Sequence, residues 1–132
     1  MQIPVNYLAV VAAAVAAYTL SWVWYAVLSA IWTRGGDKKK GHARPSPMPF
    51  ILAAVAYFLM AWMLAGLMGH VANVTIKGGI MAAFFVWVGF VLTTTAVNQA
   101  FEGRHPSVTV IDVGNWLVVL IVMGAIIGAF GV

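Results

Sequence analysis

The chain contains no cysteine and only three acidic residues among its 132 residues. Without cysteine it can form no disulfide framework, no thiolate metal site and no nucleophilic thiol. Of the three histidines, His42 and His105 belong to the first and third loops and His70 ends the second apolar stretch, and they form no HxxxH pair. The sequence also shows no glycine-rich phosphate loop and no nucleophile elbow. We therefore expect no bound metal, no cofactor and no enzymatic activity.

Charge of either sign is scarce, whereas apolar residues dominate the chain. Only 8% of the residues are charged, 64% are hydrophobic and the mean hydropathy is +0.99, values far from those of a soluble domain. A helix needs about 20 apolar residues to cross a hydrocarbon core of about 30 Å. Four stretches meet this length, at residues 5–32, 50–70, 79–100 and 109–131. We predict an all-α polytopic membrane protein, an antiparallel bundle of four transmembrane helices in a single domain, residues 1–132.

Basic residues are unevenly distributed among the connections between these spans. The second loop contains only Lys77, and the N-terminal segment contains none. The other six lie in the first and third loops: Arg34, Lys38, Lys39, Lys40, Arg44 and Arg104. Because lysine and arginine stay on the cytoplasmic side, both termini are expected on the outer side of the membrane.

Most of the net charge of +4 belongs to the first loop, GGDKKKGHARP. This segment is too short and irregular for a nucleic-acid module. We expect it to act as a topology signal that also touches anionic lipid headgroups, with binding of a protein partner as the alternative.

Small residues recur at four-residue spacing and mark the predicted helix contacts, because lipid-embedded helices associate through close packing. They are Ala9, Ala13 and Ala17 in the first span, Ala61, Ala65 and Gly69 in the second, and Gly124 and Gly128 in the fourth. We expect Gly124 and Gly128 to pack against another span of the same chain. A seam between two copies of the chain is the alternative.

Aromatic residues gather in the second half of the first span. Tyr18, Trp22, Tyr25, Ser29 and Trp32 recur at steps of four and three, which places them on one helical face. Packing and a position in the interfacial aromatic belt are the expected roles of this stripe. A site for a flat ligand such as a quinone is the alternative.

A polar segment, NQAFEGRHPSVTVIDVGN, connects the third span to the fourth. Its candidate polar cluster comprises Asn98, Glu102, Arg104, Asp112 and Asn115. Spacing predicts that Asn98 and Asp112 meet at similar depth, with Arg104 as the counter-charge.

Gly103 is placed to end the third span in a left-handed cap, and Thr109 to Asp112 resembles a capping box that starts the fourth. Fastening of this hairpin is the favoured role of the cluster. A proton or substrate site and a partner-docking patch are the alternatives.

Several of these segments also resemble the bacterial family of small four-span membrane proteins called domain of unknown function 1761, over nearly the whole chain. The matching segments are Asn6-Tyr7-Leu8-Ala9-Val10, Trp24-Tyr25, Pro47-Met48-Pro49-Phe50, Gly89-Phe90, Phe101-Glu102-Gly103-Arg104, Ile111-Asp112 and Met123-Gly124-Ala125-Ile126. The resemblance implies the four-span topology and draws attention to the FEGR and ID segments. It implies no activity. We expect the protein in a bacterial inner membrane.

Two functional hypotheses follow. The first is a non-enzymatic accessory or assembly component of the inner membrane, whose partners are the lipid bilayer and either copies of itself or other membrane proteins. The second is a small carrier or proton-coupled transporter that uses the polar cluster around Asp112. Its weakness is that the middle of the predicted membrane region contains no ionisable group.

Overall fold

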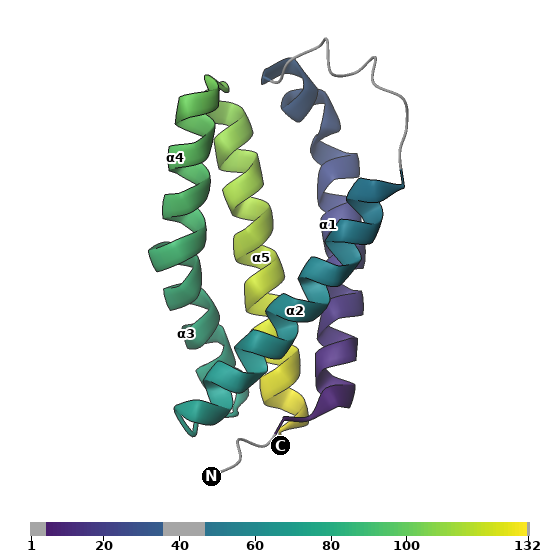
Figure 1. The fold of residues 1–132 in the computed structure, drawn as a ribbon, viewed down its shortest axis with the longest axis vertical. Helices are drawn as coiled ribbons and strands as arrows, with labels where there is room; N and C mark the ends of the chain where they lie inside the picture. The colour runs from purple at the N-terminus through teal and green to yellow at the C-terminus, as the bar shows by residue number, and fades with distance from the viewer. Residues whose placement is uncertain (1–4, 36–46, 132) are drawn as a thin grey trace.

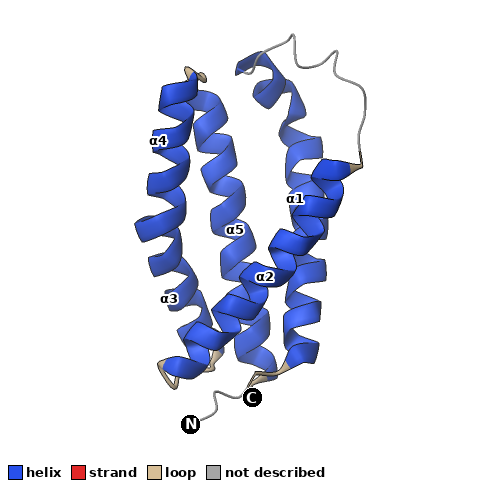
Figure 2. Cartoon of the chain, in the orientation of Figure 1, coloured by secondary structure: helices blue, strands red, loops and turns tan. Residues whose placement is uncertain are grey.

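The computed structural model describes residues 5–35 and 47–131, the side chains of 29–35 excepted, and this part of the chain consists of helices joined by short turns, without strands (Figures 1 and 2). Its elements are α1 (Tyr7–Gly35), α2 (Met48–His70), α3 (Ile76–Val86), the π-helical segment η2 (Trp87–Leu92), α4 (Thr93–Glu102) and α5 (Pro106–Phe130). Four helical segments are long and apolar enough to cross a membrane, and α3, η2 and α4 together form the third of them. The predicted all-α membrane fold is therefore confirmed.

The α4–α5 turn shows why one helix boundary was predicted wrongly. Gly103 ends α4 in the left-handed conformation, with φ 73°, as the sequence predicts. However, α5 begins at Pro106, and its N-cap is His105, whose ring Nδ1 accepts a hydrogen bond from the Ser107 N–H at 3.1 Å. Proline is preorganised for the first turn of a helix, so it starts α5 three residues before Thr109. The capping box predicted from Thr109 to Asp112 does not exist, because both residues lie inside α5.

Helix α5 lies between α1 and the α3–α4 helix, while α2 crosses the bundle obliquely (Figure 1). Half of the most apolar 18-residue window of α5 is buried, against 22% for α1 and 6% for the third span. Contacts between α1 and α5 join Ser21 to Asn115 and Tyr25 to Asp112, so residue numbers rise along α1 as they fall along α5. The central helix thus runs opposite to α1.

The small residues of α1 and α2 lie in the interior of the bundle. Ala9, Ala13 and Ala17 are all 0% exposed, and Ala61 and Ala65 of α2 are also buried. Their short side chains allow the helices to approach closely, as membrane helices require. The larger core residues that pack with them are Met68, Val119, Leu120, Met123 and Ile127.

Gly124 and Gly128 of α5 form very close contacts with the third span and the residue before it. A Cβ atom on Gly124 would collide with the backbone carbonyl of Gly79, and one on Gly79 would collide with the carbonyl of Gly124. A Cβ on Gly128 would collide with the carbonyl of Thr75. The face that carries Gly124 and Gly128 is therefore covered by the third span and the residue before it. It leaves no surface there for a seam between two copies.

This contact predicts that Gly124→Ala destabilises the protein, because the added methyl group must push α3 and α5 apart. Overpacking of this kind lowers the free energy of unfolding by about 1–3 kcal/mol. Gly66→Ala is the matched control, since a Cβ there has nothing within 4 Å. It should be neutral or stabilise the helix by up to about 1 kcal/mol. The measurement is denaturant unfolding in detergent micelles followed by tryptophan fluorescence; equal stability of the two variants would show that the contact is absent.

Candidate functional site

The acid on α5, Asp112, lies inside the bundle and is 8% exposed. Its Oδ1 accepts a hydrogen bond from the Tyr25 hydroxyl of α1, and its Oδ2 accepts one from the Gln99 Nε2 of α4, each at 2.5 Å. The Thr109 hydroxyl donates to Gln99 Oε1 at 2.7 Å. Because the amide oxygen of Gln99 is held in this way, its NH2 group is directed at Asp112. Both carboxylate oxygens therefore have fixed donors from two other spans.

A second group of hydrogen bonds, centred on Asn115, lies further along the same face of α5 than the bonds of Asp112. The Tyr57 hydroxyl of α2 donates to Ser21 Oγ at 2.7 Å, and Ser21 Oγ donates to Asn115 Oδ1 at 2.9 Å. Asn115 is 1% exposed and follows Asp112 by three residues, which places both on one side of α5. The hydrogen bonds of Asp112 and those of Asn115 together connect all four spans through polar side chains. Within the described residues, no fully buried side-chain nitrogen or oxygen is left without a hydrogen bond.

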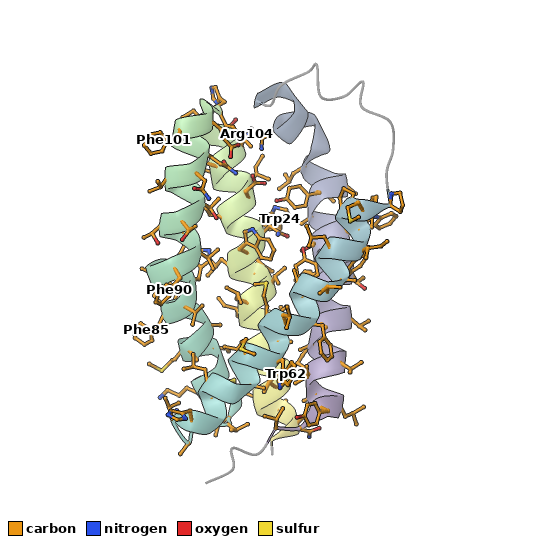
Figure 3. All side chains as sticks on the ribbon, in the orientation of Figure 1. Trp24, Trp62, Phe85, Phe90, Phe101 and Arg104 are labelled. Atoms are coloured by element: carbon orange, nitrogen blue, oxygen red, sulfur yellow. The ribbon has the colours of Figure 1, made fainter. Side chains whose placement is uncertain are left out.

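Two tryptophans hold the backbone of α5 at the same level. Trp24 Nε1 donates to the Ile111 carbonyl at 3.0 Å, and Trp87 Nε1 donates to the Val113 carbonyl at 2.8 Å. Figure 3 shows Trp24 between α1 and α5. A Cβ on Gly114 would lie 3.0 Å from the Trp24 ring, so the glycine makes room for the indole. These bonds fix α5 against α1 and the third span, beside Asp112 and Asn115.

Depth decides what the buried acid costs. At about 1.5 Å per residue, the 25 residues of α5 are longer than the hydrocarbon core by about 7 Å. In an upright α5 that extends equally beyond both sides of the core, Asp112 would lie about 5 Å inside the core and Asn115 about 10 Å inside. An ionised aspartate at the bilayer centre costs about 2.5–3.5 kcal/mol, and less near the surface. A hydrogen bond to a charged group contributes about 1.5–3 kcal/mol. The two bonds from Tyr25 and Gln99 are therefore sufficient to hold Asp112 at this depth as part of the structure.

The five residues of the predicted polar cluster do not assemble as one unit. Asp112 and Asn115 are buried, but Asn98 and Glu102 are exposed on α4, and the amide that reaches Asp112 belongs to Gln99. The prediction that Asn98 meets Asp112 is wrong by one residue. Arg104 is half-buried in the α4–α5 turn (Figure 3) and lies close enough to Tyr25 for an electrostatic interaction.

The π-helical segment η2 explains this error. Each residue of a π-helix turns the chain through a smaller angle than a residue of an α-helix, so six π-helical residues delay the following face by about one residue. A continuous α-helix from Gly79 would place Asn98 at the angle that Gln99 occupies in the structure. Because η2 spans Trp87–Leu92, Gln99 faces α5 and Asn98 faces outward.

The predicted aromatic stripe divides among several contacts. Tyr25 binds Asp112, and Tyr18 packs edge-on against Tyr57 at a centroid distance of 6.0 Å, whereas Trp22 is 66% exposed. The Ser29 and Trp32 side chains lie outside the described residues. A cavity of about 220 Å³ opens between α1 and α2, and Tyr18, Ser21, Tyr25 and Tyr57 contribute to its lining.

Two further observations concern ligands. A cavity of about 320 Å³ between α2, the third span and α5 is lined by apolar side chains alone, among them Met60, Leu64 and Leu120. Among the described residues, no group of three or more histidine and acidic side chains could hold a metal ion. His42, the acid Asp37 and the basic residues of the first loop from Lys38 to Arg44 lie outside the described part.

The network predicts different effects for two adjacent amides of α4. Gln99→Leu removes the donor to Asp112 and the acceptor for Thr109, and leaving such buried groups unsatisfied costs about 1–3 kcal/mol of unfolding free energy. Asn98→Leu is the matched control, because Asn98 is exposed and should leave the stability unchanged. Denaturant unfolding in the same micelles measures both variants. A larger loss for Asn98→Leu than for Gln99→Leu would contradict the observed register of α4.

Comparison with known proteins adds a family and no function. No curated protein and no solved structure gives a significant match to the chain. A family model described as "Protein of unknown function (DUF1761)" matches residues 8–128, a range that begins in α1 and ends in the last turn of α5. That range contains the whole hydrogen-bonded network around Asp112 and Asn115. The chain therefore belongs to the DUF1761 family.

Proposed function

We propose that this protein is a non-enzymatic interaction component of the membrane, an accessory or assembly subunit that binds copies of itself or other membrane proteins. One observation carries the proposal. The polar groups inside the bundle are satisfied by one another, whereas the third span directs Asn98 and Glu102 outward. The buried polar groups fasten the bundle, and the outward side chains of Asn98 and Glu102 are available to a neighbouring protein.

The distribution of burial supports this proposal. Only 6% of the most apolar window of the third span is buried, so most of its surface is available for contact. Its outward side chains include large apolar residues, among them Phe85, Phe90 and Phe101, which project from the α3–α4 side of the bundle (Figure 3). Lipid chains offer polar side chains on such a surface no partner, so these side chains gain hydrogen bonds only from another helix or from water that reaches them.

We also infer a bacterial inner membrane as the location, with both termini on the outer side. Six of the seven lysine and arginine residues belong to the two loops that this orientation places in the cytoplasm. The seventh, Lys77, begins the third span at the end of the bundle away from the α4–α5 turn. This orientation places Asp112 on the cytoplasmic side of the bilayer centre.

Isolation of the protein with its surrounding lipid tests the proposed function. A tagged copy, extracted from native membranes in polymer-bounded nanodiscs, should bring with it an untagged copy or another membrane protein in a fixed ratio. An unrelated four-span protein with the same tag and expression level provides the control for chance co-extraction. Recovery of a monomer alone, under conditions that preserve known complexes from the same membranes, would refute the proposal.

A carrier is the second candidate function, and the cavity between α1 and α2 is the observation that favours it. The Tyr25 side chain contributes to this cavity and its hydroxyl donates to Asp112, so a solute there would be one hydrogen bond away from the acid. A proton could then be exchanged at the Asp112 carboxylate when solute binding displaces Tyr25.

The carrier hypothesis predicts that Asp112→Asn lowers solute-coupled proton flux into liposomes at least tenfold. The reason is that an amide side chain cannot accept and release a proton as a carboxylate does. Glu102→Gln is the matched control, because Glu102 is exposed at the end of α4 and away from the cavity. Equal flux in the parent and the Asp112→Asn protein, in every assay that the parent passes, would eliminate this function.

A further inference from the structure

The outward side of α4 carries polar and apolar side chains that the described bundle does not cover. We define this α4 face as Thr94, Val97, Asn98 and Phe101, which are all exposed. Thr94 and Asn98 are four residues apart and so lie one above the other, with Val97 and Phe101 beside them. Within the described part of the chain, the Asn98 side chain makes no hydrogen bond, although its amide has two donor hydrogens and an acceptor oxygen.

The depth of Asn98 makes this exposure informative. Asn98 is next to Gln99, which binds Asp112, and it lies four residues, or about 6 Å, before the end of α4 at Glu102. By the same count as for α5, the 27-residue third span extends about 5 Å beyond the core on each side, so Asn98 lies just inside the core, where lipid chains offer neither donors nor acceptors. An exposed amide there gains a partner only from water that penetrates the headgroup layer or from another transmembrane helix.

We propose that the α4 face binds the same face of a second copy of this chain, with Asn98 hydrogen-bonded to the partner's Asn98 across a two-fold axis. This inference rests on the proposed function and names its partner. Copies inserted with the same topology are related by an axis along the membrane normal, so their α4 helices pack in parallel with equal residues at equal depth.

The chemistry of the α4 face suits a second copy. An amide is both donor and acceptor, so it is complementary to itself under two-fold symmetry, whereas a charged side chain would repel its copy. One asparagine in an apolar helix seam is also a known determinant of register and of oligomeric state. A different protein would need an unrelated sequence to present a matching polar group at the same depth.

The surroundings of Asn98 fit the same arrangement. One turn below the α4 face, Gly89 is exposed, and a Cβ there would have nothing within 4 Å, which leaves space for the backbone of an approaching helix. Glu102 lies at the end of α4, where water reaches it and screens the repulsion between the two copies. The α4 helices of the two copies are therefore expected to cross between Gly89 and Glu102, on the Gly89 side of Glu102.

The absence of cysteine from the chain allows a direct test with single cysteines. Val97→Cys places a thiol on the α4 face. Val23→Cys is the matched control on α1: both valines are about half exposed, at 54% and 49%, and each precedes by two residues a side chain that binds Asp112. Copper–phenanthroline oxidation in native membranes should give at least ten times more disulfide-linked dimer from Val97→Cys than from Val23→Cys. Equal yields, or none from Val97→Cys, would overturn the inference.

The role of Asn98 is tested in the Val97→Cys protein. Loss of an interhelical side-chain hydrogen bond weakens membrane-helix association by roughly threefold to thirtyfold, so Asn98→Leu should lower the dimer yield at limiting protein density by a factor in that range. Asn98→Gln keeps the amide and should restore part of the yield. An undiminished dimer in Asn98→Leu would overturn the proposed amide pair. Unfolding curves of these variants should match the parent, because Asn98 has no bond within the bundle.

The inference and the proposed function fail in different ways. If Val97→Cys gives no dimer but a tagged copy still isolates an untagged copy or another membrane protein, the interaction function stands and this interface is wrong. If no dimer forms and only a monomer is isolated, both are wrong.

Discussion

Inside a bilayer, lipid chains offer polar groups no hydrogen-bond partners, and this constraint organises the described bundle around α5. Asp112 and Asn115 belong to α5, and their partners come from α1, α4 and, through Ser21, α2. A helix that binds every other span through side chains must lie among them. This is why α5 is the most buried of the four spans and the third span, joined to it along one side, is the least.

Hydrogen bonds between side chains of different helices require the helices to lie close together, and small residues allow this close approach. Gly79 and Gly124 bring α3 and α5 into backbone contact at one end of the pair, while Gln99 and Asp112 join α4 and α5 near the other. Gly114 in the same way allows the Trp24 ring of α1 to approach α5 closely. Lipid supplies little drive for apolar helices to associate, so packing determines how near the helices come and the polar bonds determine their rotation.

The sequence is sufficient to predict the features that depend on composition or on one local signal. The four spans follow from hydrophobic length, and the cap at Gly103 follows from the freedom of glycine to adopt positive φ. The site was only half predictable, because a helical wheel assumes a constant turn per residue and η2 violates it. Ser21 could have been found as the hydroxyl between Tyr18 and Tyr25 on the stripe, but Tyr57 had no such signal, since its role depends on how α2 crosses α1.

The π-helical segment η2 determines which residue of α4 faces α5 and which faces outward. Asn98 and Gln99 are adjacent amides, and only one of them can face α5. An uninterrupted third span would turn Asn98 toward Asp112 with a side chain one methylene shorter, and it would rotate Gln99 away from its bonds to Thr109 and Asp112. With η2 present, the longer amide reaches the acid and the shorter one is left on the surface. A single residue of helical register thus fixes both the bond that fastens α4 to α5 and the polar group that the third span carries on its outward side.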